Sequence, residues 1–143
     1  KKHSGRKGYK NIKFLGYLED TEFNALLQSA DIAATTLIDG MEHVSMPSRA
    51  LTYMSAGLPY LSIMRLKSDL GDLVAEEQCG WVAETTAEAS SILTTLADDR
   101  TQITIAAQNA SQAYAARFTR ASGIRNYSQM ITITQTDTRQ SNR

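Results

Sequence analysis

Polar and charged side chains concentrate in residues 38–48 (IDGMEHVSMPS), a segment that contains Asp39, Glu42, His43 and Ser45. The segment joins a predicted strand to a predicted helix. Such connections are usually about 2–6 residues long, and longer ones tend to carry function. The segment is therefore the strongest candidate in the chain for a binding or catalytic site.

The residues that open the predicted helix, Pro47, Ser48 and Arg49, have the chemistry of an anion site. Proline suits the first turn of a helix, and the free backbone N–H groups and positive dipole end found there can hold a phosphate. Ser48 adds a hydroxyl donor and Arg49 a fixed positive fork. Plainer interpretations stay open: Ser48 as a helix cap, Arg49 on a solvated face, and His43 as an ordinary loop residue. The residues alone predict an anion-binding loop.

Other chemistries lack their motifs. The sequence contains neither G-x-S-x-G nor the Gly-rich phosphate loops G-x-G-x-x-G and Walker A. Cys79 is the single cysteine, which excludes an internal disulfide and a multi-cysteine zinc site, and we expect it in the core. The 15 basic and 15 acidic residues give a net charge of zero, so we expect no nucleic-acid partner.

Short apolar runs alternate with helical patterns, which predicts an α/β fold with a Rossmann-like parallel sheet and flanking helices. Ligands of such sheets bind outside the carboxyl ends of the strands, where residues 16–20, 38–48 and 65–68 would lie. Strands are expected at residues 11–16, 31–37, 58–64 and 79–83. Helices are expected around Phe23, Leu26, Leu27 and Ala30, over residues 47–56 and 68–78, in two stretches after Thr86, and over residues 120–133.

The 143 residues have room for one domain. We expect a flexible basic leader over residues 1–10, the domain over 11–133 and a disordered tail over 134–143. Doubly wound sheets usually have five or six strands, so one or two strands are expected to precede this chain, with a naturally small sheet as the alternative. The absence of a long apolar run or signal peptide predicts a cytoplasmic protein, and contact of the leader with the inner face of a membrane stays open.

Five short motifs follow one another along the chain: residues 11–17 (NIKFLGY), 30–32 (ADI), 47–49 (PSR), 56–59 (AGLP) and 79–82 (CGWV). Taken in this order, they resemble the C-terminal domain of retaining glycosyltransferases of family 4. The resemblance extends over residues 11–127 and includes the Arg-Phe-Thr of residues 117–119. It implies the GT-B architecture, in which two Rossmann-like domains face a cleft and the C-terminal one holds the nucleotide-sugar donor.

The resemblance also implies roles for individual residues. Many family members carry two glutamates separated by seven residues, and Val44 and Thr52 stand at those places here. The chain instead resembles a subgroup with Met-Glu-Asn before Pro-Ser-Lys, found among transferases for bacterial surface polysaccharides. In that subgroup's pattern Glu42 would position the sugar, and Arg49 with the helix start would stabilise the diphosphate leaving group. The implied donor-site residues are Gly16, Tyr17, Leu18, Glu42, His43, Val44, Ser45, Pro47, Ser48, Arg49 and Thr52.

The leading hypothesis from the sequence is therefore the donor-binding part of a retaining glycosyltransferase. It would transfer a hexose-type sugar from a nucleotide diphosphate to a glycan or lipid-linked acceptor, together with an N-terminal acceptor domain outside this chain. No cofactor and no metal are expected, because helix amides and cationic side chains neutralise phosphate in this fold. The alternatives are a non-catalytic interaction module and a related GT-B sugar-nucleotide epimerase.

Overall fold

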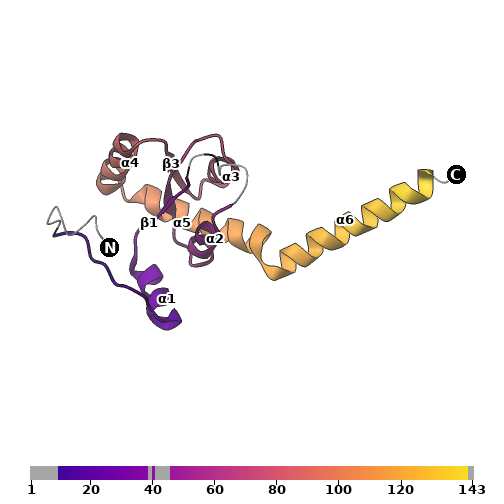
Figure 1. The fold of residues 1–143 in the computed structure, drawn as a ribbon, viewed down its shortest axis with the longest axis horizontal. Helices are drawn as coiled ribbons and strands as arrows, with labels where there is room; N and C mark the ends of the chain where they lie inside the picture. The colour runs from indigo at the N-terminus through magenta and orange to yellow at the C-terminus, as the bar shows by residue number, and fades with distance from the viewer. Residues whose placement is uncertain (1–9, 39, 41–45, 142–143) are drawn as a thin grey trace.

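A three-stranded parallel sheet forms the centre of the molecule (Figure 1). The computed structural model describes residues 10–38, 40 and 46–141 of the chain, with side chains through residue 131. The strands lie in the order β1 (Ala33–Thr36), β2 (Tyr60–Ile63) and β3 (Gly80–Ala83). Helix α2 (Ser48–Ser55) connects the first pair and α3 (Asp69–Glu77) the second. The chain is thus α/β and consistent with a fragment of a Rossmann-like fold.

Helices cover both faces of the sheet. Successive strand residues point to opposite faces, so Tyr60 contributes to one core and Leu61 to the other. Helices α2, α3 and α5 (Thr101–Ala113) pack on the face of Tyr60, and α4 (Thr86–Asp98) packs on the face of Leu61. The larger core consists of Ala50, Met54, Tyr60, Met64, Leu70, Leu73, Val74, Cys79, Ala110 and Ala113. The smaller one is built from Leu61, Ala83 and Ala89.

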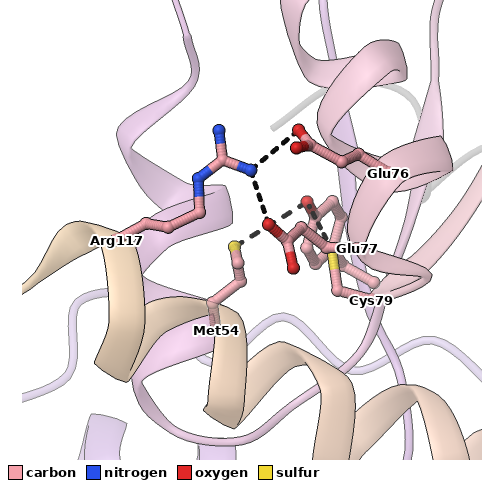
Figure 2. A network of polar contacts seen from close by, with 6 residues as sticks. Met54, Glu76, Glu77, Cys79 and Arg117 are labelled. Atoms are coloured by element: carbon pink, nitrogen blue, oxygen red, sulfur yellow. Dashed lines mark hydrogen bonds and ion pairs between the residues drawn. The ribbon is translucent and has the colours of Figure 1, made fainter.

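The C-terminal part leaves the sheet through a short π-helix. Helix α5 continues into η2 (Tyr114–Phe118), and α6 (Arg120–Ser141) then projects away from the body of the molecule (Figure 1). The Arg117 guanidinium donates to the carboxylates of Glu76, at 2.8 Å, and Glu77, both at the end of α3 (Figure 2). These contacts link η2 to the end of α3, close to the point where α6 begins.

Three of the four predicted strands are confirmed in shortened form, and the prediction of a strand over residues 11–16 is wrong. That segment is not part of the sheet, and all of its side chains are exposed. An apolar segment becomes a strand only when a neighbouring strand accepts its backbone hydrogen bonds, and here it has not joined β1. The sequence pattern identified an extended conformation but not the partner that a strand needs.

The predicted helices are all present, with two differences. Helix α1 (Asp20–Ser29) follows its N-cap residue Glu19, but only Leu27 of its expected apolar face is buried, while Phe23 and Leu26 stay 37% and 40% exposed. Helix α6 continues past residue 133 to Ser141. The division into leader, domain and tail stays a prediction, and residues 1–9 lie outside the described part of the chain.

Tyr60, Cys79 and Met54 form a buried cluster within the larger core. The Tyr60 hydroxyl lies 3.4 Å from the Cys79 sulfur and donates to the Met54 sulfur at 3.9 Å. Figure 2 marks both contacts by dashed lines that end at the sulfur atoms of Met54 and Cys79. All three residues are 0% exposed, which confirms Cys79 as a core residue. Burial raises the pKa of the Cys79 thiol and of the Tyr60 phenol.

We expect the stability of the protein to fall in alkaline solution. Because the pKa of Cys79 is raised in the folded state, the unfolded chain releases its proton first as the pH passes about 8.5, and folding loses free energy from there upward. Tyr60 adds to the loss above about pH 10. Urea titrations from pH 7 to 10 would measure this decrease in the free energy of unfolding. A Cys79→Ala variant that loses stability with pH as steeply as the wild type would contradict the role of the thiol.

Gly80 is required for the packing of β3 on β2. A Cβ atom at this position would lie 2.1 Å from the Tyr60 carbonyl oxygen, far inside contact distance. We therefore expect Gly80→Ala to lower the free energy of unfolding by about 1–3 kcal/mol, as overpacked cores do. Gly123→Ala is the control, since a Cβ there meets nothing within 4 Å and should stabilise α6 by about 0.5–1 kcal/mol. If thermal melts showed the same change in stability for both variants, the close approach of Gly80 to the Tyr60 carbonyl would be refuted.

Candidate functional site

Three helices begin at the carboxyl edge of the sheet, and the N-termini of two of them are capped by side chains. At α3 the Ser68 hydroxyl accepts the Gly71 N–H at 3.0 Å, and at α4 the Thr85 hydroxyl accepts the Glu88 N–H at 3.1 Å. Both helices also have acidic residues in the first turn. These side chains satisfy the free N–H groups and offset the helix dipole. An external anion therefore finds neither end favourable.

The N-terminus of α2 differs from both. Its N-cap residue is Pro47, which makes no side-chain cap, and its first turn contains no acidic residue. Ala50 and Met54 are fully buried and hold the helix in place, while Ser48 and Arg49 are exposed to solvent. The Ala50 N–H donates to the Pro47 carbonyl at 3.0 Å, which leaves the N–H groups of Ser48 and Arg49 without an acceptor within the helix. A fixed, positively polarised helix start with a guanidinium beside it is suited to an anion.

The structure places only part of the expected site. Pro47, Ser48 and Arg49 lie together at the start of α2, as the sequence predicts. Thr52 lies one turn further on, where its hydroxyl donates to the Ser48 carbonyl at 3.2 Å and so is engaged by its own helix. The other expected residues of this connection, Asp39, Glu42, His43, Val44 and Ser45, lie outside the described residues, and their roles stay predictions.

The family resemblance also implies that the backbone of the turn of Gly16, Tyr17 and Leu18 reads the nucleotide base, but the structure does not bring this turn to α2. Gly16, Tyr17 and Leu18 immediately precede α1, where Gly16 has a φ of +75° and Tyr17 is 87% exposed. In Figure 1 the chain leading into α1 lies well apart from the start of α2. A role for this turn in binding a nucleotide base stays a prediction.

The sequence analysis missed Glu84, which links two connections at the carboxyl edge. Its carboxylate accepts the Leu66 N–H at 2.9 Å, and its own N–H donates to the Glu88 carboxylate at 2.8 Å. Glu84 therefore ties the connection after β2 to the one after β3. The available signal was its place directly after the last strand, because residues that follow the other predicted strands were expected to contribute to a ligand site.

A groove of about 460 Å³ lies elsewhere, between α3, β3 and α5. Its lining, as far as the structure describes it, is apolar or neutral and includes Val74, Trp81 and Ile105. It therefore lacks the charge that the start of α2 offers to an anion. Within the described ranges, no group of three or more histidine, cysteine or acidic side chains is arranged to hold a metal ion. The described helices include none long and apolar enough to cross a membrane.

Comparison with known proteins supports a relationship to glycosyltransferases. The chain is 31% identical over 81 residues to the probable glycosyltransferase WbjE of Pseudomonas aeruginosa. The match covers 57% of this chain and 20% of that protein, so the chain corresponds to a small part of this relative. No protein-family model and no solved structure matches the chain.

A substitution at Ser48 tests whether the α2 N-terminus can still accept a negative charge. We expect Ser48→Asp to raise the free energy of unfolding by about 0.3–1 kcal/mol over Ser48→Asn, because a negative charge at a free helix start is favourable. Asparagine has nearly the same shape without the charge. Denaturant unfolding at low and high salt would show the gain and its screening. No difference between the two variants would mean that another group already neutralises this helix end.

Proposed function

We propose that this chain is the nucleotide-sugar donor-binding part of a retaining glycosyltransferase of the GT-B, family 4 type. The observation that carries the proposal is the N-terminus of α2, which lies at the ligand-binding edge of a parallel sheet, lacks a side-chain cap and an acidic first turn, and presents Ser48 and Arg49 to solvent. The similarity to a probable glycosyltransferase supports the reaction class. The reaction would move a hexose-type sugar onto a glycan or lipid-linked acceptor.

In this proposal the start of α2 binds the diphosphate of the donor. Breaking the bond between sugar and diphosphate leaves additional negative charge on the phosphate oxygens. The amides of Ser48 and Arg49 and the Arg49 guanidinium would stabilise that charge, which is the usual contribution of preorganised donors to catalysis. Glu42 would position the sugar, and the segment of His43, Val44 and Ser45 would face sugar and diphosphate. No metal or cofactor takes part in the proposed site.

The complete reaction would require a further domain. The acceptor is proposed to bind to an N-terminal domain of a longer polypeptide, across a cleft from this chain. Because both substrates must meet in that cleft, this chain alone is expected to bind the donor without transferring the sugar.

One observation favours a second candidate, a non-catalytic module that keeps the fold. The two glutamates common in the family are replaced by Val44 and Thr52, and the Thr52 hydroxyl is bound to its own helix rather than directed toward a ligand. A module of this kind would bind no nucleotide sugar, so donor binding separates the two candidates.

Calorimetric titration with UDP, GDP and ADP and with their nucleosides would test the proposal. We expect a diphosphate to bind with at least tenfold preference over its nucleoside. Arg49→Ala should weaken diphosphate binding about tenfold, because a solvent-exposed hydrogen bond to a charged group contributes at the low end of about 1.5–3 kcal/mol. Nucleoside binding should stay unchanged.

Arg125→Ala is the matched control for the loss of one positive charge. Arg125 is exposed on α6, far along the chain from α2, and should have no effect on binding. If both arginine variants lost the same diphosphate affinity, the change in net charge alone would explain the effect of Arg49→Ala. If Arg49→Ala weakened nucleoside and diphosphate equally, the phosphate role of Arg49 would be wrong.

A further inference from the structure

The groove between α3, β3 and α5 follows the outer edge of β3. Gly80, Trp81 and Val82 all line it, although Trp81 and Val82 contribute to cores on opposite faces of the sheet. One face of a strand presents only every second residue, so a groove lined by three successive residues runs along the edge of the strand. All three are half-buried, whereas their partners in β2 are fully buried. The edge of β3 is therefore accessible from the groove.

The backbone of this edge offers hydrogen-bonding groups to a ligand. The Met64 N–H donates to the Ala83 carbonyl at 3.0 Å, so Ala83 directs its backbone groups toward β2. Neighbouring residues of a parallel strand alternate in this direction, and Val82 therefore directs its N–H and carbonyl away from β2. In the described part of the chain, β3 pairs with β2 alone. An unpaired strand edge of this kind is a template for another extended segment.

The lining of the groove favours an uncharged ligand. As far as the structure describes it, the lining contains no charged side chain. Its helical walls are apolar at Val74, Ala75, Ile105 and Ala106, and its polar side chains are the neutral amides of Gln78 and Gln102. A charged side chain placed here would lose hydration without gaining an opposite charge. The ligand that fits both features is uncharged and offers backbone donors and acceptors of its own.

We propose that this groove binds an extended, uncharged peptide segment, which adds to the outer edge of β3 as a further strand of the sheet. Backbone hydrogen bonds with Val82 hold the segment, and apolar side chains at its alternate positions lie against Val74 and Ile105. Addition of a strand to a sheet edge is a recurring mode of peptide recognition, in which the backbone supplies affinity and alternate side chains supply specificity. This binding activity goes beyond the proposed function and does not rest on it.

The shape of the groove favours a peptide over two other occupants. Because the edge of β3 lies beside the walls of α3 and α5, these helices in two copies of the chain would meet before their β3 strands could pair. A helical ligand would leave the Val82 backbone groups unsatisfied, since the backbone groups of a helix are bonded within it. A single extended segment avoids both conflicts.

Trp81 provides the signal for a direct test, because it is the single tryptophan of the chain and lines the groove. The probe is the peptide acetyl-Ser-Val-Thr-Val-Ser-amide, which is uncharged and has no aromatic residue. We expect its titration to change the Trp81 fluorescence in a saturable way. The same peptide with its three central backbone nitrogens methylated keeps the side chains but loses donors, and should bind at least tenfold more weakly. No saturable change, or equal binding of both peptides, would overturn the proposal.

A charge in the wall of the groove should block the peptide. Ile105 is 51% exposed, so Ile105→Arg should leave the fold intact, which circular dichroism would check, and should weaken peptide binding at least tenfold. Leu93→Arg is the matched control, because Leu93 is a 46% exposed leucine of α4 that does not line this groove. Peptide binding to this variant should be unchanged. If both variants lost the same affinity, the assignment of the groove would be wrong.

Sedimentation velocity tests the second copy as the alternative occupant. A monomer at the concentrations used for the peptide titration would support the proposal. A dimer that Ile105→Arg abolishes would show that a second copy fills the groove, and would overturn it. The calorimetric titration with nucleotides keeps the two proposals apart: peptide binding without nucleotide binding would support the groove and overturn the function, and nucleotide binding without peptide binding would do the reverse.

Discussion

The fold depends on β2, which is hydrogen-bonded to a strand on each side and buried on both faces. Tyr60 and Leu61 are 0% and 3% exposed, and they anchor the two cores that hold the helices to the sheet. The approach of Gly80 to the Tyr60 carbonyl brings β3 to its place. Because α2 packs on the same core through Ala50 and Met54, the position of its N-terminus follows from the packing around β2.

The α2 N-terminus combines a rigid support with an N-cap that makes no side-chain hydrogen bond. A capping side chain typically stabilises a helix by about 1 kcal/mol, and α2 has none at its N-cap. The buried side chains of Ala50 and Met54 compensate, since complete burial of one methionine contributes roughly 1.5–3 kcal/mol. The helix is thus held from its buried face, and its first turn lies at the carboxyl edge of the sheet.

Much of this could be predicted from the sequence, because the signals were local. Apolar runs identified β1, β2 and β3, while Pro47 and Gly57 correctly bounded α2. The strand over residues 11–16 was wrong because strand formation depends on a partner that lies outside the pattern of one segment. Glu84 was missed for a similar reason, since its contact with Leu66 joins residues far apart in the chain. The exposed face of α1 shows that helical periodicity does not guarantee a surface to pack against.

The predicted phosphate-binding residues also combine features that the local sequence shows with features that only the folded structure shows. The pairing of Ser48 and Arg49 with a helix start was readable from Pro47, and the absence of acidic residues in the first turn is visible in the sequence itself. The difference from α3 and α4 emerged only when the three helix starts were seen at one edge.

The attachment of α6 makes it a lever. Its 22 residues extend about 33 Å at 1.5 Å per residue, and its root is fixed by η2 and the contacts of Arg117 with Glu76 and Glu77. A rotation of about 10° at that root would displace the far end of a helix of this length by roughly 6 Å. Small changes in the packing at this root are therefore magnified along the helix.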